Sequence, residues 1–105
     1  MSDKSILRRE ILDDAMFLTS NDRNKDYGDP ADNFEATANM WSAYKGVVFT
    51  AHDVAAMMIL LKVSRLSCSP AKRDNWVDIA GYAALGGEVA PYLQQSEEVS
   101  RLHEA

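Results

Sequence analysis

The sequence is poor in the residues from which disulfides, zinc sites and membrane spans are built. Of its 105 residues, one is cysteine and two are histidine. Cys68 alone cannot form an internal disulfide, which favours a reducing, intracellular setting. No apolar run reaches the roughly 18–20 residues of a membrane-spanning helix, and the N-terminus lacks the apolar core of a signal peptide. We therefore expect a cytoplasmic protein without membrane contact.

A strongly basic surface is also missing. The formal net charge is −5, which argues against a protein that coats nucleic acid, because such proteins present a basic face. A small phosphorylated ligand held by a few local cations remains compatible with this charge. A chain of 105 residues is expected to form one domain with a modest core, so a homo-oligomer is expected.

Signals for β-strands are weak, and only the short run Val47-Val48-Phe49 is β-like. Apolar residues instead recur at helical spacing. We predict an all-α fold, a single helical domain over residues 1–105, with a polar tail from about Gln94 that is helical or frayed. The four main helices are expected at about Ser5 to Ser20, Pro30 to Tyr44, Ala51 to Ser67 and Asn75 to Leu85.

Capping residues set the expected helix boundaries. Asp29-Pro30 supplies an N-cap and a first helical position, and Gly46 is a suitable C-terminal stop. Thr50 and Asp53 have the spacing of a capping box. Asp74 is the expected cap of the last helix, and Gly86-Gly87 is expected to weaken or break that helix.

Asp78 is the main anomaly of the sequence. It is the one residue from Trp76 to Leu85 that is neither apolar, aromatic nor glycine. Burial of a carboxylate is unfavourable unless it is paired or binds a ligand. The preceding apolar helix carries Lys62 and Arg65, so the two helices together predict either a structural ion pair or a polar binding site.

The candidate ligand site gathers polar and aromatic groups around Asp78. Lys62 and Arg65 share a helix face and could hold a phosphate, while Asn33 could contact a base or ribose. The predicted ligand-binding residues are Tyr27, Asn33, Lys62, Arg65, Asn75, Asp78 and Tyr82.

A metal site is expected only if the protein is an enzyme. Carboxylate oxygens are the ligands that Mg²⁺ prefers. In that case the predicted ligands are Glu35, Asp53 and Asp78, and otherwise no cofactor is expected.

Three blocks of the sequence stand out together. They are Tyr27-Gly28-Asp29-Pro30 with Asn33-Phe34, Asp53-Val54-Ala55 through Met58, Lys62 and Arg65, and Asp74-Asn75-Trp76-Val77-Asp78-Ile79-Ala80-Gly81-Tyr82. With these blocks the chain resembles a family of small phage and prophage proteins, over about Arg8 to Leu85. More distantly, the layout is similar to the MazG-type all-α nucleotide pyrophosphohydrolases, which are helical oligomers that hydrolyse nucleoside triphosphates with Mg²⁺, using Glu-Glu-x-x-Glu and Glu-x-x-Asp motifs.

The chain departs from the MazG-type motifs, because it offers only Glu35 on the second helix and has Asn75 where the last motif has glutamate. Only Asp78 matches. The leading hypothesis is therefore a phage-type protein that binds or sequesters a nucleotide or a nucleotide-derived signal of host defence, in the host cytoplasm. One alternative is a Mg²⁺-dependent nucleoside triphosphate pyrophosphohydrolase. Another is a non-enzymatic interaction module in which Asp78 and Lys62 form an internal ion pair.

Overall fold

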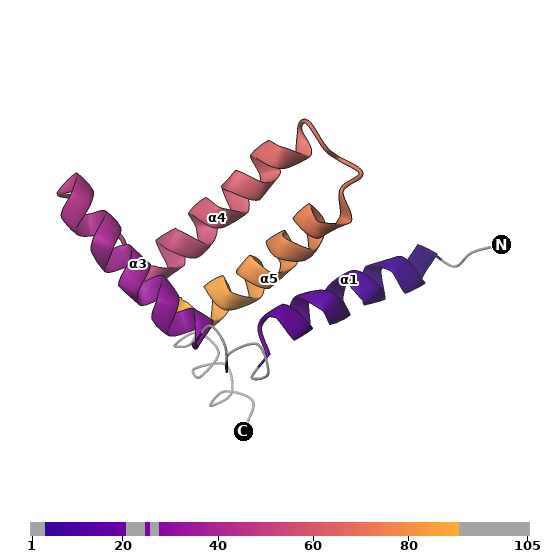
Figure 1. The fold of residues 1–105 in the computed structure, drawn as a ribbon, viewed down its shortest axis with the longest axis horizontal. Coiled ribbons are helices and arrows are strands. Elements are labelled where there is room, and N and C mark those ends of the chain that lie inside the picture. Colours follow the sequence, from indigo (N-terminus) through magenta and orange to yellow (C-terminus); the bar gives the residue numbers. More distant parts are fainter. Residues whose placement is uncertain (1–3, 21–24, 26–27, 91–105) are drawn as a thin grey trace, which may run out of the picture.

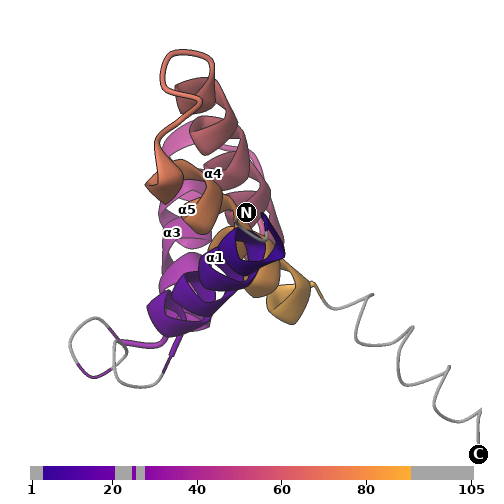
Figure 2. The same cartoon turned by 90° about the vertical axis from the view of Figure 1, so that its right-hand side faces the viewer.

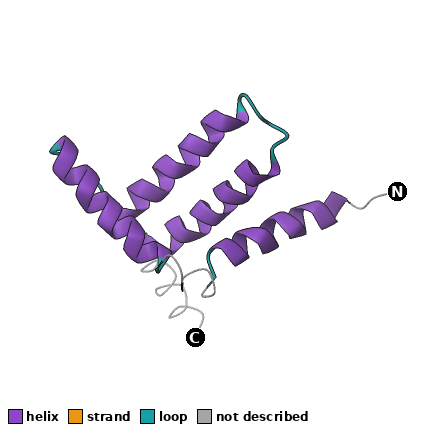
Figure 3. Ribbon diagram, in the orientation of Figure 1, coloured by secondary structure: helices purple, strands orange, loops and turns teal. Residues whose placement is uncertain are grey.

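The computed structural model describes residues 4–20, 25 and 28–90. The predicted all-α class with four main helices is confirmed, and the described residues contain no strand (Figures 1 and 3). The predicted polar tail lies outside the described residues. The four helices are α1 (Lys4–Leu18), α3 (Pro30–Lys45), α4 (Ala51–Leu66) and α5 (Arg73–Val89).

Helix α5 occupies the centre of the bundle and contacts the other three helices. Its neighbours α4 and α1 lie on either side of it, and α4 runs antiparallel to it after the turn at residues 67–72 (Figure 1). Helix α3 packs against α4 and α5, and Figure 2 shows it behind them when the bundle is turned. This arrangement brings the ends of α1, α3 and α5 together.

The boundaries of α3 and the start of α4 follow the predicted capping chemistry. Asp29 precedes Pro30 and its side chain accepts a hydrogen bond from the Ala31 amide. Gly46 ends α3 with a φ of 68°, in the left-handed region that glycine adopts without steric penalty. Thr50 and Asp53 form both hydrogen bonds of the predicted capping box.

The predicted boundaries of α5 are wrong at both ends. The helix begins at Arg73, and its N-cap residue Lys72 makes no capping hydrogen bond through its side chain. Asp74 therefore lies in the first turn, where its negative charge interacts favourably with the positive end of the helix dipole. Gly86 and Gly87 lie inside the helix, which continues to Val89.

Close packing against α4 explains the glycine at position 86. A Cβ atom at Gly86 would lie 3.1 Å from the Cβ of Ala55, which is tighter than ordinary van der Waals contact. The two helices approach closely because both residues are small. The glycine thus serves helix packing rather than helix termination.

The core is built mostly from small side chains. Among the described residues, Val54 is the largest side chain that is fully buried. None of the described helices is both long and apolar enough to cross a membrane. The buried apolar residues are Ala15, Ala38, Ala51, Val54, Ala55, Val77, Leu85 and Ala90.

Candidate functional site

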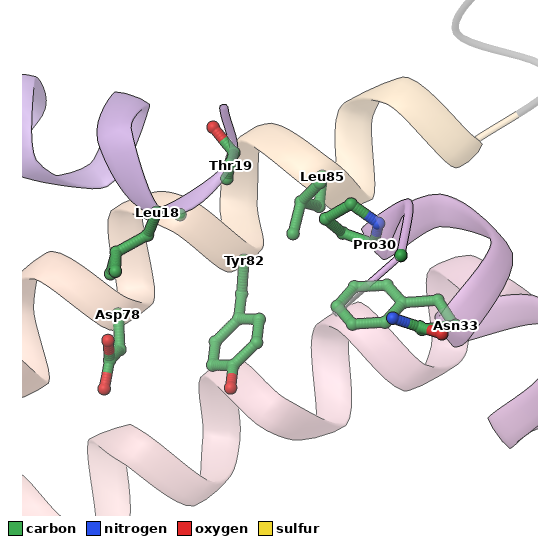
Figure 4. A pocket seen from close by; sticks show the side chains of 10 residues that line it. Leu18, Thr19, Pro30, Asn33, Asp78, Tyr82 and Leu85 are labelled. Carbon is green, nitrogen blue, oxygen red and sulfur yellow. The ribbon is translucent and has the colours of Figure 1, made fainter. Parts of the chain in front are cut away.

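A cavity of about 320 Å³ opens where the end of α1 and the start of α3 meet α5 (Figure 4). Its walls combine apolar, aromatic and glycine residues with four polar side chains. The lining residues are Leu18, Thr19, Gly28, Pro30, Asn33, Phe34, Asp78, Gly81, Tyr82 and Leu85.

The chain segment after α1 supplies one edge of the cavity. The Thr19 hydroxyl donates to the carbonyl oxygens of Ala15 at 3.2 Å and Met16 at 3.0 Å, which holds this side chain against the last turn of α1. Gly81 is buried, and a Cβ there would lie 3.9 Å from the Thr19 methyl carbon. The lack of a side chain at Gly81 thus leaves room for α1 beside the cavity.

Asp78 lines the cavity and is also held by an ion pair across α4 and α5. Its Oδ2 atom lies 2.9 Å from Nζ of Lys62. The Lys62 side chain is 12% exposed and the Asp78 side chain 27% exposed, so the expectation of a partly buried carboxylate is confirmed. The predicted ion pair is therefore present, and the same carboxylate lines the cavity, while the predicted polar binding site stays a prediction.

Two aromatic rings form a second wall. The centroids of Phe34 and Tyr82 lie 6.0 Å apart, with the ring planes tilted by 33°. Tyr82 is one helical turn beyond Asp78, and both side chains project from the same side of α5 (Figure 4). Asn33 contributes an amide from α3. The cavity therefore places an acceptor carboxylate and an amide beside an aromatic surface.

Three of the seven predicted ligand residues, Asn33, Asp78 and Tyr82, line the cavity. Lys62 contacts it only through Asp78. Arg65 is exposed near the end of α4 and does not line it, so the structure does not bring Lys62 and Arg65 together there as a phosphate grip.

Of the remaining two predicted ligand residues, one is described and does not line the cavity. Asn75 is buried, with 5% of its surface exposed, one turn before Asp78. Tyr27 lies outside the described residues. The sequence did not predict the apolar wall, which includes Leu18, Pro30 and Leu85. Leucines at helical spacing indicate a core, and Pro30 indicates the start of a helix, so neither pattern points to a cavity.

The three acids predicted to bind a metal lie apart. Glu35 is exposed on α3 and does not line the cavity. Asp53 accepts from the Thr50 amide at 2.9 Å, and this hydrogen bond lowers the pKa of the Asp53 carboxyl below its ordinary value of 3.8. Within residues 4–20, 25 and 28–90, no three histidine, cysteine or acidic side chains are placed to hold a metal ion. The residues present therefore do not fit a shared Mg²⁺ site.

The fold and the cavity define a small all-α protein in which a cavity of about 320 Å³ lies between helix ends. Residues 10–90 match the family described as "Domain of unknown function (DUF6378)", and the chain belongs to this family.

Two relatives come from phages. The chain is 49% identical over 76 residues to the "Gene 55 protein" of Mycobacterium phage L5, covering 71% of this chain and 49% of the relative. It is 39% identical over 77 residues to the "Gene 55 protein" of Mycobacterium phage D29, covering 73% of this chain and 51% of the relative. The predicted membership of a phage protein family is thus confirmed. No solved structure matches the chain.

The chain spans about half the length of these two relatives. The family match over residues 10–90 includes the whole of α3, α4 and α5 and the second part of α1. The cavity therefore lies inside the region that the family shares.

Proposed function

We propose that the cavity binds the nucleoside part of a nucleotide or of a nucleotide-derived signal. The observation that carries this proposal is the combination of an aromatic wall with a carboxylate that is fixed in place. Phe34 and Tyr82 supply the wall, and Lys62 fixes Asp78.

The chemistry of the walls suits a base and its sugar. Apolar and aromatic surfaces favour a planar base, and a few oriented polar groups give a small-molecule site its specificity. Asp78 bonds Lys62 through Oδ2, so Oδ1 is available to accept from a ribose hydroxyl or a base N–H group. The volume of about 320 Å³ lies near the lower limit of small-molecule sites, which are about 300–1,000 Å³, and fits a mononucleoside.

Binding without hydrolysis agrees with the separation of the acids. Glu35 and Asp53 do not line the cavity, and among the described residues Asp78 is its one lining carboxylate. A protein of this kind would withhold a nucleotide-derived signal of host defence, or buffer a nucleotide pool, in the host cytoplasm. The phage origin of its relatives supports such a role.

The test is calorimetric titration with a panel of nucleosides, mononucleotides, triphosphates and cyclic nucleotides. At least one member is expected to bind wild type. Y82A removes one of the two rings of the aromatic wall and leaves both residues of the ion pair in place, and it is expected to weaken binding at least about tenfold, the effect of losing about 1.4 kcal/mol. D14N changes a carboxylate that does not line the cavity and is expected to bind as wild type. Absence of binding to every member would refute the proposal.

A second candidate is a non-enzymatic interaction module, and the Lys62–Asp78 ion pair favours it. In this reading the pair serves only to fix α4 against α5. The double variant K62D/D78K would then fold where each single variant is impaired, and no nucleotide would bind wild type. A double variant no better than either single change would remove the ion pair from this reading.

A further inference from the structure

Helix α4 has an uncharged surface on the side that does not face the core. We name this surface the α4 outer face. Leu60 is 65% exposed, Val63 48%, Leu61 43% and Met57 41%. The face consists of Ala56, Met57, Leu60, Leu61, Val63 and Ser64, all of them exposed.

On its other side α4 faces the bundle. Val54 and Ala55 are buried there, and Lys62 is turned towards Asp78 of α5. Contiguous exposed apolar surface on a protein marks an interaction site more often than chance. The α4 outer face is such a surface, and the described residues of the chain leave it uncovered.

We infer that the α4 outer face of a second copy of the chain covers it. The buried apolar residues that the structure describes are mostly alanine, with Leu85 and two valines, Val54 and Val77, as the larger members. Smaller domains bury a smaller fraction of their surface on folding, so a small core gains from apolar surface buried between chains. A second copy is present wherever the chain is made.

The distribution of charge also favours a second copy of the chain. At a net charge of −5, two copies repel each other in general. A two-fold interface brings the same surface of both copies together, so any charge in it meets its own equivalent. The six residues of the α4 outer face carry no ionisable side chain, and the exposed Arg65 lies beside them, so self-association through this face brings few like charges together.

The spacing of the face fits an antiparallel pair of α4 helices. Met57, Leu60, Leu61 and Ser64 follow one another at intervals of three, one and three residues, which places them along one stripe. A two-fold axis between Leu60 and Leu61 sets Met57 against Ser64 of the second copy. A large side chain then meets a small one at both ends of the contact. No α4 residue lines the cavity, so this dimer leaves the proposed ligand site open.

Sedimentation equilibrium over a wide concentration range tests the inference with two matched variants. S64K places a charge in the α4 outer face at an exposed helical position. A36K makes the same charge change at an exposed position of α3. Both variants reduce the net negative charge, so general repulsion falls equally in each.

Wild type and A36K are expected to sediment at twice the 11.7 kDa of one chain. S64K is expected to raise the dissociation constant about 100-fold or more, because dimerisation would bury the lysine ammonium without a partner against Met57 of the second copy. Circular dichroism establishes that both variants are folded. If S64K does not fold, L60D, compared with V48D in the exposed loop before α4, replaces it.

Cysteine pairing gives an independent readout of the antiparallel geometry. The chain with C68S, M57C and S64C is expected to form a disulfide-linked dimer on oxidation, whereas C68S with M57C alone is not. Three results would each overturn the inference: a monomeric wild type at all concentrations, a dimer that S64K leaves intact, or a dimer that A36K disrupts instead.

Discussion

Replacing Lys62 with methionine is expected to lower the free energy of unfolding by about 2 kcal/mol. This loss lies between those expected for breaking an exposed and a buried ion pair. The substitution keeps an unbranched apolar side chain in contact with the core and removes only the ammonium group. Asp78 is then left as a partly buried carboxylate without its partner at 2.9 Å.

The magnitude follows from the burial of the two side chains. Breaking a fully buried pair by removing one partner costs about 3–5 kcal/mol, and exposed pairs contribute about 0–1 kcal/mol. Lys62 is 12% exposed and Asp78 27% exposed, so water still reaches part of the carboxylate. For a domain of this size, a loss of about 2 kcal/mol corresponds to a fall in Tm of roughly 10 °C.

Urea denaturation followed by circular dichroism, at one fixed protein concentration, measures this loss. K62M, D78N and the double variant complete a double-mutant cycle, and a coupling free energy of about 1 kcal/mol or more is expected between the two residues. The exposed ion pair of Arg73 with Asp14 provides the control, and R73M is expected to change stability by less than about 0.5 kcal/mol. Purely additive losses in the cycle, or an equal loss in R73M, would refute the reasoning.

Three further substitutions test the packing and capping of α4 and its neighbours by the same denaturation assay. G86L is expected to destabilise by about 2 kcal/mol, because its side chain meets Ala55, and A55G is expected to restore part of this loss. D53A is expected to cost about 0.5 kcal/mol at neutral pH. Because the pKa of Asp53 is lowered on folding, this difference is fully present above pH 3.8 and should shrink as the pH falls below it; a constant difference would contradict the assignment. S42A removes the hydroxyl that accepts from the Phe49 amide at 2.8 Å, and a loss of about 1 kcal/mol is expected.

The elements that the sequence predicted well are those whose cause is local. The N-cap at Asp29, the left-handed Gly46 and the capping box of Thr50 with Asp53 depend on residues at most a few positions apart. The end of α5 was predicted wrongly because its cause is not local. Gly86 weakens a helix by intrinsic propensity, but its contact with Ala55 across the bundle outweighs that effect.

The candidate site was predicted in part for the same reason. A lone aspartate in an apolar helix indicates a partner, and the nearby Lys62 was a natural choice. Helical spacing also placed Tyr82 on the same face as Asp78. The contribution of Leu18 and Thr19 could not be predicted, because it depends on how α1 packs against α5, and no pattern within either helix specifies that.

The central claim is that Asp78 and the aromatic wall beside it bind a nucleoside group. Calorimetric titration of wild type, Y82A and D14N against the same nucleotide panel tests this claim most directly. The account predicts saturable binding of at least one nucleotide by wild type and D14N, weakened at least about tenfold in Y82A. Equal affinity in all three proteins, or no binding by wild type, would contradict it.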